Sequence, residues 1–393
     1  MNSFIYDSPT KVLFGRGCGR NVAAEIRAFG GKKVLLVYGG HSAEKSGLLA
    51  KVGHELEAAG LPYRSLGGVR PNPHLELAEK GVNLALECGA DFILAVGGGS
   101  VIDTAKAISL GAANPGANLW NFWLRKVKPE TSLPVGVILT ISASGSETSD
   151  SAVLTNQNTG EKRGLSNGIL RPRFAFLDPE LTFTLPKYQV ACGIVDIMMH
   201  TLDRYFTPTE GNELTDEIAE ALLRVVIRNG TKALKNPDDY QAMSELMWAG
   251  SLSHNGLTGL GAQADFAVHQ LGHELSAMFD VAHGASLSAV WNSWARYCYQ
   301  SKPERFARYA RKVWNVDCAG TEAVALQGIE TTVSYFKSLD MPVNFSGLGI
   351  GRQSEETLRE LADRCVFRGK RKVGSFRVLD RGDVYQIYSL ANH

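Results

Sequence analysis

Two segments in the second half of the chain carry metal-ligand side chains at a spacing of four residues. In the first, Asp196 and His200 lie in the stretch 194–200, which contains no glycine or proline. On a helix this spacing places both side chains on one face, one turn apart. Burying an ionised aspartate among isoleucine, valine and methionine costs several kcal/mol unless a cation or hydrogen-bond donors compensate. The pattern therefore predicts a positively charged partner on this face.

The second segment carries His269 and His273, and His283 follows ten residues later. Three histidines and one aspartate suit divalent iron or zinc and leave a position open for a substrate oxygen. The metalloprotease motif H-E-x-x-H is not met, because Gln270 takes the place of the glutamate. A single histidine of this kind is more often a hydrogen-bonded core or surface residue. The coincidence of several such placements favours a catalytic metal site.

A glycine-rich turn in the first half indicates a different chemistry, the binding of phosphate. The sequence Gly-Gly-Gly-Ser at 97–100 follows a strand-like run at 92–96 and precedes a helix-like segment. Glycines there let backbone N–H groups approach a pyrophosphate, which the positive end of the helix stabilises. The full G-x-G-x-x-G fingerprint is not met, because Ile102 stands at the third glycine position. A tight turn without any ligand is equally compatible with this motif alone.

Two further loops have a composition typical of a ligand-binding edge. Residues 140–148, rich in serine and threonine, follow the apolar run 135–139, and a glycine pair follows the run 34–37. The carboxyl ends of parallel strands meet at one edge of a sheet, where doubly wound folds bind their ligands. Three such loops make nucleotide binding the favoured interpretation.

The elements that position these residues follow two different patterns. From about residue 32 to residue 177, short β-branched apolar runs alternate with helix-like stretches, which is typical of βαβ units. After Asp178-Pro179 the apolar residues recur at three- and four-residue spacing instead. The sequence predicts an α/β dinucleotide-binding domain over 1–184, with a Rossmann-like parallel sheet, and an all-α metal-binding domain over 185–393.

Composition excludes several classes of protein. The 393 residues include 41 lysines and arginines against 40 aspartates and glutamates, so no strong positive field attracts nucleic acid. No apolar run approaches the ~20 residues of a membrane-spanning helix, and the N-terminus lacks the apolar stretch of a secretory signal. The six cysteines are scattered without a C-x-x-C pair, as expected for reduced thiols. We expect a cytoplasmic protein that binds neither nucleic acid nor membrane.

The motifs together resemble those of the iron-dependent (group III) alcohol dehydrogenases, and within them the butanol dehydrogenase and broad aldehyde reductase branch. The resemblance spans nearly the whole chain. It is carried by residues 92–106, 144–147 and 178–182, by the Asp196/His200 segment, and by residues 272–284. It implies a dinucleotide-binding domain, a helical metal-binding domain, an active site in the cleft between them, and a homodimer.

The resemblance also implies roles for individual residues. It places Fe²⁺, with Zn²⁺ as the alternative, on Asp196, His200, His269 and His283. His273 is left off the metal, and we assign it a proton-relay or positioning role beside the substrate. The residues expected to bind the cofactor are Gly39, Gly40, Ser42, Lys45, Gly97, Gly98, Gly99, Ser100, Asp103, Thr140, Ser144 and Leu181.

The segment after the first buried strand bears on which dinucleotide is used. NAD-preferring members of the family carry an aspartate there, whereas this chain has Tyr-Gly-Gly-His-Ser at 38–42. Gly40 makes space, Ser42 and Lys45 can donate hydrogen bonds to a 2′-phosphate, and we expect no carboxylate in the pocket. These features predict NADP, with NAD as the alternative. His41 could either aid or crowd the phosphate.

The leading hypothesis is a metal-dependent alcohol dehydrogenase or aldehyde reductase that transfers hydride between NADP(H) and a primary alcohol or aldehyde. Aromatic residues such as Phe266, Trp291 and Trp294 could line an apolar substrate pocket, although a core position is the simpler interpretation. A dehydroquinate-synthase-like or glycerol-dehydrogenase-like enzyme is the alternative. The former needs several basic residues, and few lie between Asp196 and His283. A non-catalytic nucleotide-binding protein would have no use for four metal ligands.

The other histidines carry no such signal. We interpret them as ordinary surface or core residues: His54, His74, His254 and His393.

Overall fold

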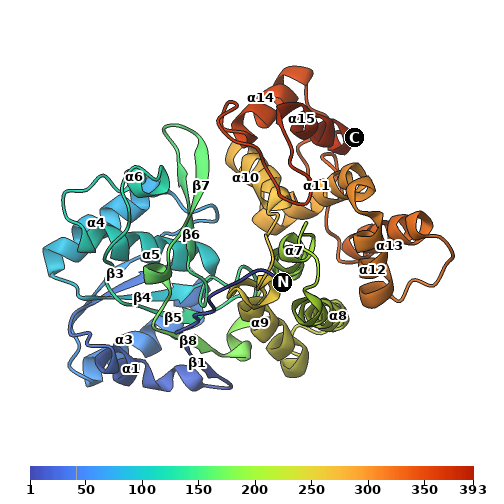
Figure 1. Ribbon diagram of the computed structural model, residues 1–393. Coiled ribbons are helices and arrows are strands. Elements are labelled where there is room, and N and C mark those ends of the chain that lie inside the picture. The colour runs from blue at the N-terminus through green and yellow to red at the C-terminus, as the bar shows by residue number, and fades with distance from the viewer. Residues whose placement is uncertain (41) are drawn as a thin grey trace. The chain divides into compact units, whose positions relative to one another are not determined.

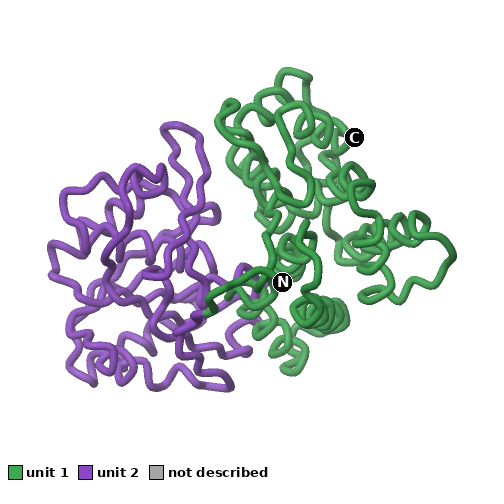
Figure 2. Tube along the Cα trace, viewed as in Figure 1, with its two compact units in different colours: residues 1–6, 186–393 green, residues 7–185 purple. Residues whose placement is uncertain are grey.

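The computed structural model describes residues 1–40 and 42–393. The chain divides into two compact units, one of residues 7–185 and one of residues 1–6 together with 186–393 (Figure 2). The unit of residues 7–185 is α/β, and the unit of residues 1–6 and 186–393 is helical (Figure 1). The predicted fold class is confirmed, and the first six residues pack with the helical unit.

The α/β unit is built on a sheet of six parallel strands. In spatial order these are β1 (Lys11–Phe14), β8 (Phe174–Leu177), β5 (Val135–Leu139), β4 (Phe92–Gly97), β2 (Val34–Tyr38) and β3 (Tyr63–Leu66). Every residue of β4, β5 and β8 is buried, which explains their continuous apolar runs. The chain moves outward from β2 to β3 and returns to β4. The loops after β2 and β4 therefore flank the switch point where ligands of such sheets bind.

The described residues of this unit form six α-helices: α1 (Val22–Ala28), α2 (Ser42–Lys45), α3 (Leu48–Ala58), α4 (Leu75–Cys88), α5 (Gly99–Ala113) and α6 (Trp120–Trp123). One apolar cluster joins α1 and α3 to the sheet, through residues such as Ile26, Leu56 and Phe92. A second cluster joins α4, α5 and α6 through Leu75, Leu110 and Trp123. The helix expected after the glycine-rich turn is α5.

An antiparallel hairpin of β6 (Ser151–Asn156) and β7 (Glu161–Ser166) was not predicted. Strand β6 ends in three buried residues, whereas β7 has only two buried residues and contains mostly polar ones. The hairpin buries Ala152, Leu154 and Leu165 in the same cluster as α4 and α6. Long-range packing therefore holds this hairpin, while its local sequence carries only a weak strand signal.

The helical unit contains nine helices in its described residues: α7 (Lys187–Tyr205), α8 (Glu213–Lys235), α9 (Tyr240–His254), α10 (Ala267–Phe279), α11 (His283–Cys298), α12 (Pro303–Trp314), α13 (Thr321–Ser338), α14 (Glu355–Cys365) and α15 (Arg381–Ala391). Helix α7 packs against α8, α9, α10 and α11, and all its residues from 193 to 205 are buried. It is thus the central helix of this unit. Within the described chain, we find no helix with the length and apolarity needed to cross a bilayer.

The tryptophans proposed as possible pocket residues lie in the core of this unit. Trp291 packs against Phe336, and Trp294 packs against Phe206 and Phe306. Both indole rings are fully buried. The core interpretation is therefore right for these two residues.

Candidate metal centre and dinucleotide site

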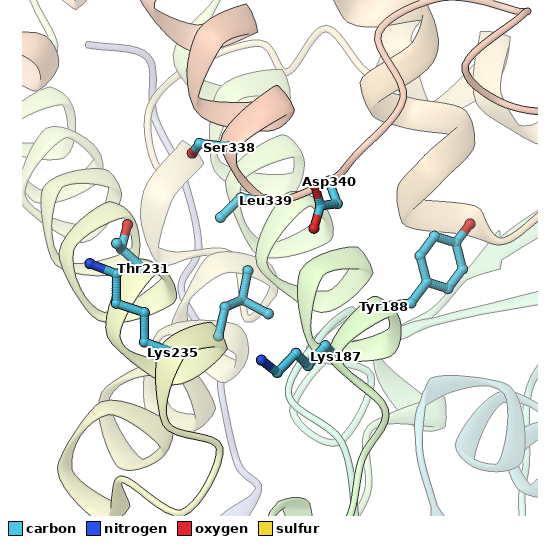
Figure 3. Close-up of a pocket in the computed structure, with 8 residues that line it drawn as sticks. Lys187, Tyr188, Thr231, Lys235, Ser338, Leu339 and Asp340 are labelled. Carbon is cyan, nitrogen blue, oxygen red and sulfur yellow. The ribbon is translucent and has the colours of Figure 1, made fainter.

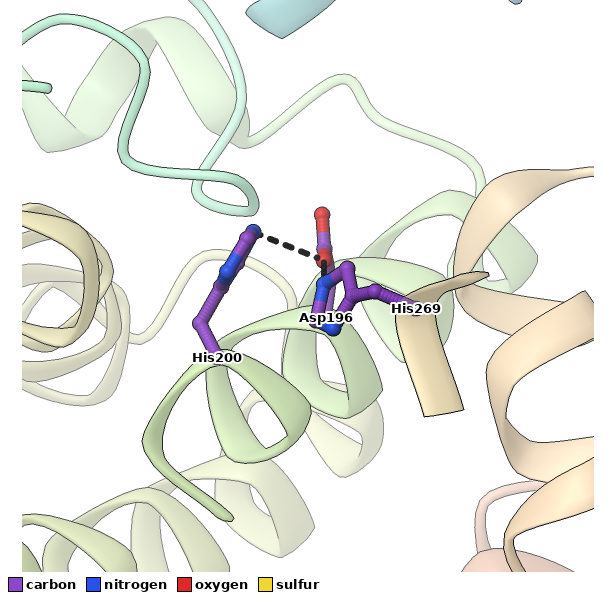
Figure 4. Close-up of side chains that lie close together, drawn as sticks. All are labelled: Asp196, His200 and His269. Carbon is purple, nitrogen blue, oxygen red and sulfur yellow. Dashed lines mark ion pairs between the residues drawn. The ribbon is translucent and has the colours of Figure 1, made fainter. Parts of the chain in front are cut away.

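The central helix presents two predicted ligands from one face (Figure 4). Asp196 and His200 are both buried on α7, and His200 Nε2 lies 3.4 Å from Asp196 Oδ1. The four-residue spacing brings them together as expected, because they stand one helical turn apart. Among the described residues, ion pairs link the Asp196 carboxylate to histidines and to no lysine or arginine.

Two other helices bring imidazoles to the same carboxylate oxygen. His269 on α10 places Nε2 3.7 Å from Asp196 Oδ1, and His283, the first residue of α11, places Nε2 3.6 Å from it. Ligand atoms of Asp196, His200 and His269 all lie within 4.8 Å of one another. The structure thus brings these three together as one cluster, with His283 beside the carboxylate.

The chemistry of these atoms fits a divalent metal. Asp196 Oδ1 and His269 Nε2 are buried and have no hydrogen-bond partner in the described structure. Burial and then the nearby imidazoles of His254 and His269 hold the pKa of His200 well below its usual value. A neutral imidazole offers its lone pair to a metal, and a cation would compensate the buried carboxylate.

A close approach of two helix backbones places His283 near the cluster. Gly284 of α11 lies against the main chain of Cys192 on α7, where a Cβ would overlap the Cys192 carbonyl. Main-chain atoms cannot move aside as a flexible side chain can. The glycine therefore permits the packing that brings the start of α11 to Asp196.

A second carboxylate, Asp203, holds His269 from behind. Its Oδ2 lies 2.5 Å from His269 Nδ1 and accepts a hydrogen bond from the His269 backbone N–H at 3.3 Å. This contact leaves Nε2 of His269 facing Asp196, as carboxylate partners of metal-ligating histidines commonly do. Sequence reasoning missed Asp203. Its position seven residues after Asp196, two turns along the same helix, was the signal that could have found it.

His273 and Phe266 border the same cluster. The His273 ring centroid lies 5.3 Å from that of His283 and 6.3 Å from that of His269. The Phe266 ring meets His269 edge-on at 5.5 Å. His273 is thus next to the proposed ligands but outside the three-residue cluster, and its proton-relay role stays a prediction.

In the α/β unit, two of the three predicted ligand-binding loops, at 97–100 and 140–148, touch each other. Gly97 ends β4, Gly98 precedes α5, and Gly99 and Ser100 begin it. The Thr140 N–H donates to the Gly97 carbonyl at 3.1 Å. A Cβ at Gly98 would overlap the Ile141 side chain, and one at Gly99 would overlap Ser144 Oγ. Close packing of the loops is therefore one physical reason for these glycines, beside access for a phosphate.

A buried charge network fastens the second loop. The Lys106 Nζ donates to the carbonyl oxygens of Ser146, Ser149 and Ser151 at 2.7–3.0 Å. Burial lowers the pKa of Lys106 to about 8, while Asp103 opposes the shift, so the ammonium is charged at neutral pH. Asp103 accepts hydrogen bonds from the Ser146 hydroxyl and the Val153 N–H at 2.6 and 2.9 Å. These contacts give Asp103, predicted as a cofactor ligand, a role in holding the loop.

The remaining predicted cofactor residues lie at the same edge of the sheet. Gly39 and Gly40 follow β2, Ser42 and Lys45 are exposed on α2, and Leu181 lies in a 3-10 turn (Pro179–Thr182) after β8. His41 lies outside the described residues.

The expectation that no carboxylate lies in this pocket stays a prediction, although one acidic residue stands between Ser42 and Lys45 in the chain. Glu44 is on α2, and its Oε1 accepts a hydrogen bond from the Tyr38 hydroxyl at 3.1 Å. Tyr38 is the last residue of β2, and its hydroxyl lies over Gly67, where an added Cβ would come within 2.7 Å of it. Residues 38–42 and Lys45 were considered as neighbours of the 2′-phosphate. Glu44, which stands next to Lys45 in α2, was not considered.

A separate pocket of about 330 Å³ lies in the helical unit (Figure 3). It is formed where the start of α7 meets the ends of α8 and α13, and its charged residues are Lys187, Lys235 and Asp340. None of the predicted metal-binding or cofactor-binding residues lines it. It is therefore not a candidate for the site described above.

A doubly wound parallel sheet is typical of nucleotide-binding proteins, and a buried cluster of one aspartate and several histidines fits a divalent metal. Residues 9–179 match the family described as "Iron-containing alcohol dehydrogenase", and residues 190–392 match "Fe-containing alcohol dehydrogenase family, C-terminal". The chain belongs to the iron-containing alcohol dehydrogenase family and is an oxidoreductase. The resemblance noted in its motifs is confirmed.

Relatives with named activities match most or all of the chain. NADH-dependent butanol dehydrogenase A of Clostridium acetobutylicum is 38% identical over 99% of both chains. The NADPH-dependent aldehyde reductase YqhD of Escherichia coli is 36% identical over 90% of this chain and 91% of its own. The crystal structure of NADH-dependent butanol dehydrogenase A from Thermotoga maritima has a TM-score of 0.95 at 35% identity, covering 100% of this chain and 99% of that one.

The contact between Asp203 and His269 leads to a prediction about metal affinity. Asp203→Asn should weaken divalent metal binding by about 10–100-fold, because the amide holds the ligating imidazole less firmly. Competition with a chromophoric chelator measures the dissociation constant. Asp216→Asn is the matched control: it removes a buried carboxylate that pairs with Arg305 away from the cluster, and should leave the affinity unchanged. Equal metal affinity in Asp203→Asn and the wild type would contradict the prediction.

Proposed function

We propose that the chain catalyses metal-dependent hydride transfer between NADP(H) and a primary alcohol or aldehyde, as an alcohol dehydrogenase or aldehyde reductase. The observation that carries this proposal is the convergence of Asp196 Oδ1 with the Nε2 atoms of His200, His269 and His283 at 3.4–3.7 Å. Fe²⁺ is the metal that we favour, and Zn²⁺ is the alternative, since both accept this set of ligands.

Each group has a defined task in this reaction. When bound, a divalent ion withdraws electron density from the oxygen of the alcohol or aldehyde. Asp196 and the three histidines hold that ion, and Asp203 fixes the orientation of His269. The loops at 97–100 and 140–148 hold the dinucleotide. His273 positions the substrate or moves its proton, because its ring is a neighbour of His269 and His283.

The substrate class follows from the relatives and from one apolar neighbour. The relatives that match most or all of the chain include a butanol dehydrogenase and an aldehyde reductase. Phe266 lies against both His200 and His269, so one wall of the metal site is aromatic. We therefore propose short primary alcohols and aldehydes, with butanal as the test substrate.

Metal removal provides the direct test of this function. After treatment with a chelator, oxidation of NADPH in the presence of butanal should be lost, since the metal ligands alone cannot polarise the carbonyl. Fe²⁺ or Zn²⁺ should then restore it, and metal analysis of the untreated protein identifies which ion is native. Reduction of butanal that continues at the full rate in metal-free protein would refute the proposal.

Some features near residues 40–45 favour NADP, and one opposes it. Gly40, Ser42 and Lys45 provide space and donors for a 2′-phosphate, whereas Glu44 brings a carboxylate that repels one. The relatives also divide, because both NADH-dependent and NADPH-dependent enzymes are among them. We retain NADP as the proposed cofactor, with NAD as the alternative.

Glu44→Gln separates these contributions. Removing the negative charge should raise kcat/KM for NADPH several-fold while that for NADH changes little, because only the 2′-phosphate is repelled. Steady-state kinetics with both reduced cofactors measures the ratio, and Glu57→Gln on α3 is a control that removes a surface carboxylate elsewhere. A wild-type kcat/KM higher for NADH than for NADPH would overturn the proposed preference.

We further propose that the protein is a homodimer. Strand β1 forms one edge of the sheet, and the N-terminal residues Phe4, Ile5 and Tyr6 are exposed, with Ile5 at 93%. Edge strands and exposed apolar residues are common sites of chain association. Sedimentation equilibrium should give twice the chain mass, and Ile5→Asp should shift it toward the monomer. A monomeric wild type would refute this assembly.

A cytoplasmic location is proposed from the thiols. All six cysteines are free, and burial raises the pKa of Cys18 and Cys192 to about 11, which keeps them protonated and unreactive. Reduced thiols are typical of the cytoplasm. Cell fractionation with an antibody against the protein tests the location.

A further inference from the structure

A histidine that the sequence left without a role lies directly against a proposed metal ligand. His254 is the last residue of α9, and its ring centroid is 3.9 Å from that of His200, with the planes inclined at 36°. No other ring contact of His200 in the described chain is as close: His269 lies at 4.2 Å and Phe266 at 6.4 Å. The interpretation of His254 as an ordinary surface or core residue is therefore incomplete.

The two buried ligands His200 and His269 are held in different ways. His269 has its Nδ1 fixed by Asp203 at 2.5 Å. The Nδ1 of His200 is buried and has no hydrogen-bond partner in the described structure. Metal-ligating histidines almost always use this second nitrogen to fix the orientation of the ring. His200 lacks that device, so packing must orient its imidazole.

The backbone around His254 makes it suited to this task. The helix α9 packs against α7 and ends at His254, where the Asn255 N–H bonds to the Ser251 carbonyl. Gly256 then takes a positive φ of 104° and turns the chain away. The position of the ring is thus set by a packed helix end. On the α7 side, Arg204 donates to the His200 carbonyl at 2.6 Å and fixes the main chain there.

We propose that His254 is a positioning residue that stacks on His200 and holds its imidazole in the orientation that binds the metal. The inference rests on the proposed metal site and adds a residue to it. In this proposal the face of the His254 ring acts on His200, and His254 itself lies outside the cluster of Asp196, His200 and His269. His254 consequently sets the affinity of the site for its metal without touching the reacting atoms.

Three variants separate the ring from its nitrogens. His254→Phe keeps a flat ring and should retain the wild-type metal dissociation constant within about threefold. His254→Ala removes the ring and should weaken binding by about 10–100-fold, the range typical of groups that orient a ligand. His254→Leu fills the space without a flat face and should resemble His254→Ala. If the alanine variant does not fold, His254→Leu provides the test of ring removal instead.

The affinities are measured on purified full-length protein, by titrating Zn²⁺ or anaerobic Fe²⁺ against a chromophoric chelator. Visible absorption of the Co²⁺-loaded protein gives a second readout, because its bands report ligand geometry. We expect those bands to shift in His254→Ala and to persist in His254→Phe. His54→Ala, an exposed histidine on α3, is the control for loss of an imidazole that could bind metal nonspecifically.

Two results would overturn the inference while leaving the proposed function intact. One is wild-type metal affinity in both His254→Ala and His254→Leu, which would show that the stack does not matter. The other is a His254→Phe variant as weak as His254→Ala, which would show that the nitrogens matter and the ring does not. A wild-type protein that binds no divalent metal would instead overturn the proposed function together with this inference.

Discussion

The burial of one carboxylate governs the helical unit. Asp196 stands in the middle of α7, and all residues of that helix from 193 to 205 are buried. An ionised group there costs several kcal/mol unless charge compensates it. The three surrounding imidazoles come from α7, α10 and α11, so these helices must meet at one point. Gly284 allows the required approach, and Asp203 and His254 hold two of the imidazoles.

In the α/β unit, buried polar groups are compensated by a lysine side chain, Lys106. The loop after β5 turns the carbonyl oxygens of Ser146 and Ser149 inward, and the buried Lys106 ammonium donates to both of them and to the carbonyl of Ser151, the first residue of β6. Asp103 balances that charge and fastens the same loop to β6. The α/β unit therefore compensates its buried polar groups with a lysine of its own sequence. In the helical unit, a bound metal would compensate the buried aspartate and histidines.

Local spacing predicted what lies within one element or at one edge of the sheet. The pair Asp196 and His200, the parallel strands and the glycine turn at 97–100 all have short-range signatures. The contacts missed are those made between elements: Asp203 reaches His269 only because α10 packs on α7, and His254 meets His200 only because α9 ends beside it. Glu44 was missed because it lies a helical turn beyond the position considered. The pairing of β6 with β7 likewise depends on burial against α4 and α6.

Several buried polar atoms of the cluster have no hydrogen-bond partner in the described structure, so metal binding there would raise the free energy of unfolding. Asp196 Oδ1, His200 Nδ1 and His269 Nε2 are buried without hydrogen-bond partners in the described residues. Each such group costs about 1–3 kcal/mol, more when it is charged. A metal on the first and last of these atoms removes that cost in the folded state alone, and binding to the folded state alone stabilises it by mass action. The stack from His254 leaves His200 Nδ1 unsatisfied, so it orients the ring but does not lower that cost. A metal bound there would consequently be a structural part of the helical unit as well as a source of chemistry.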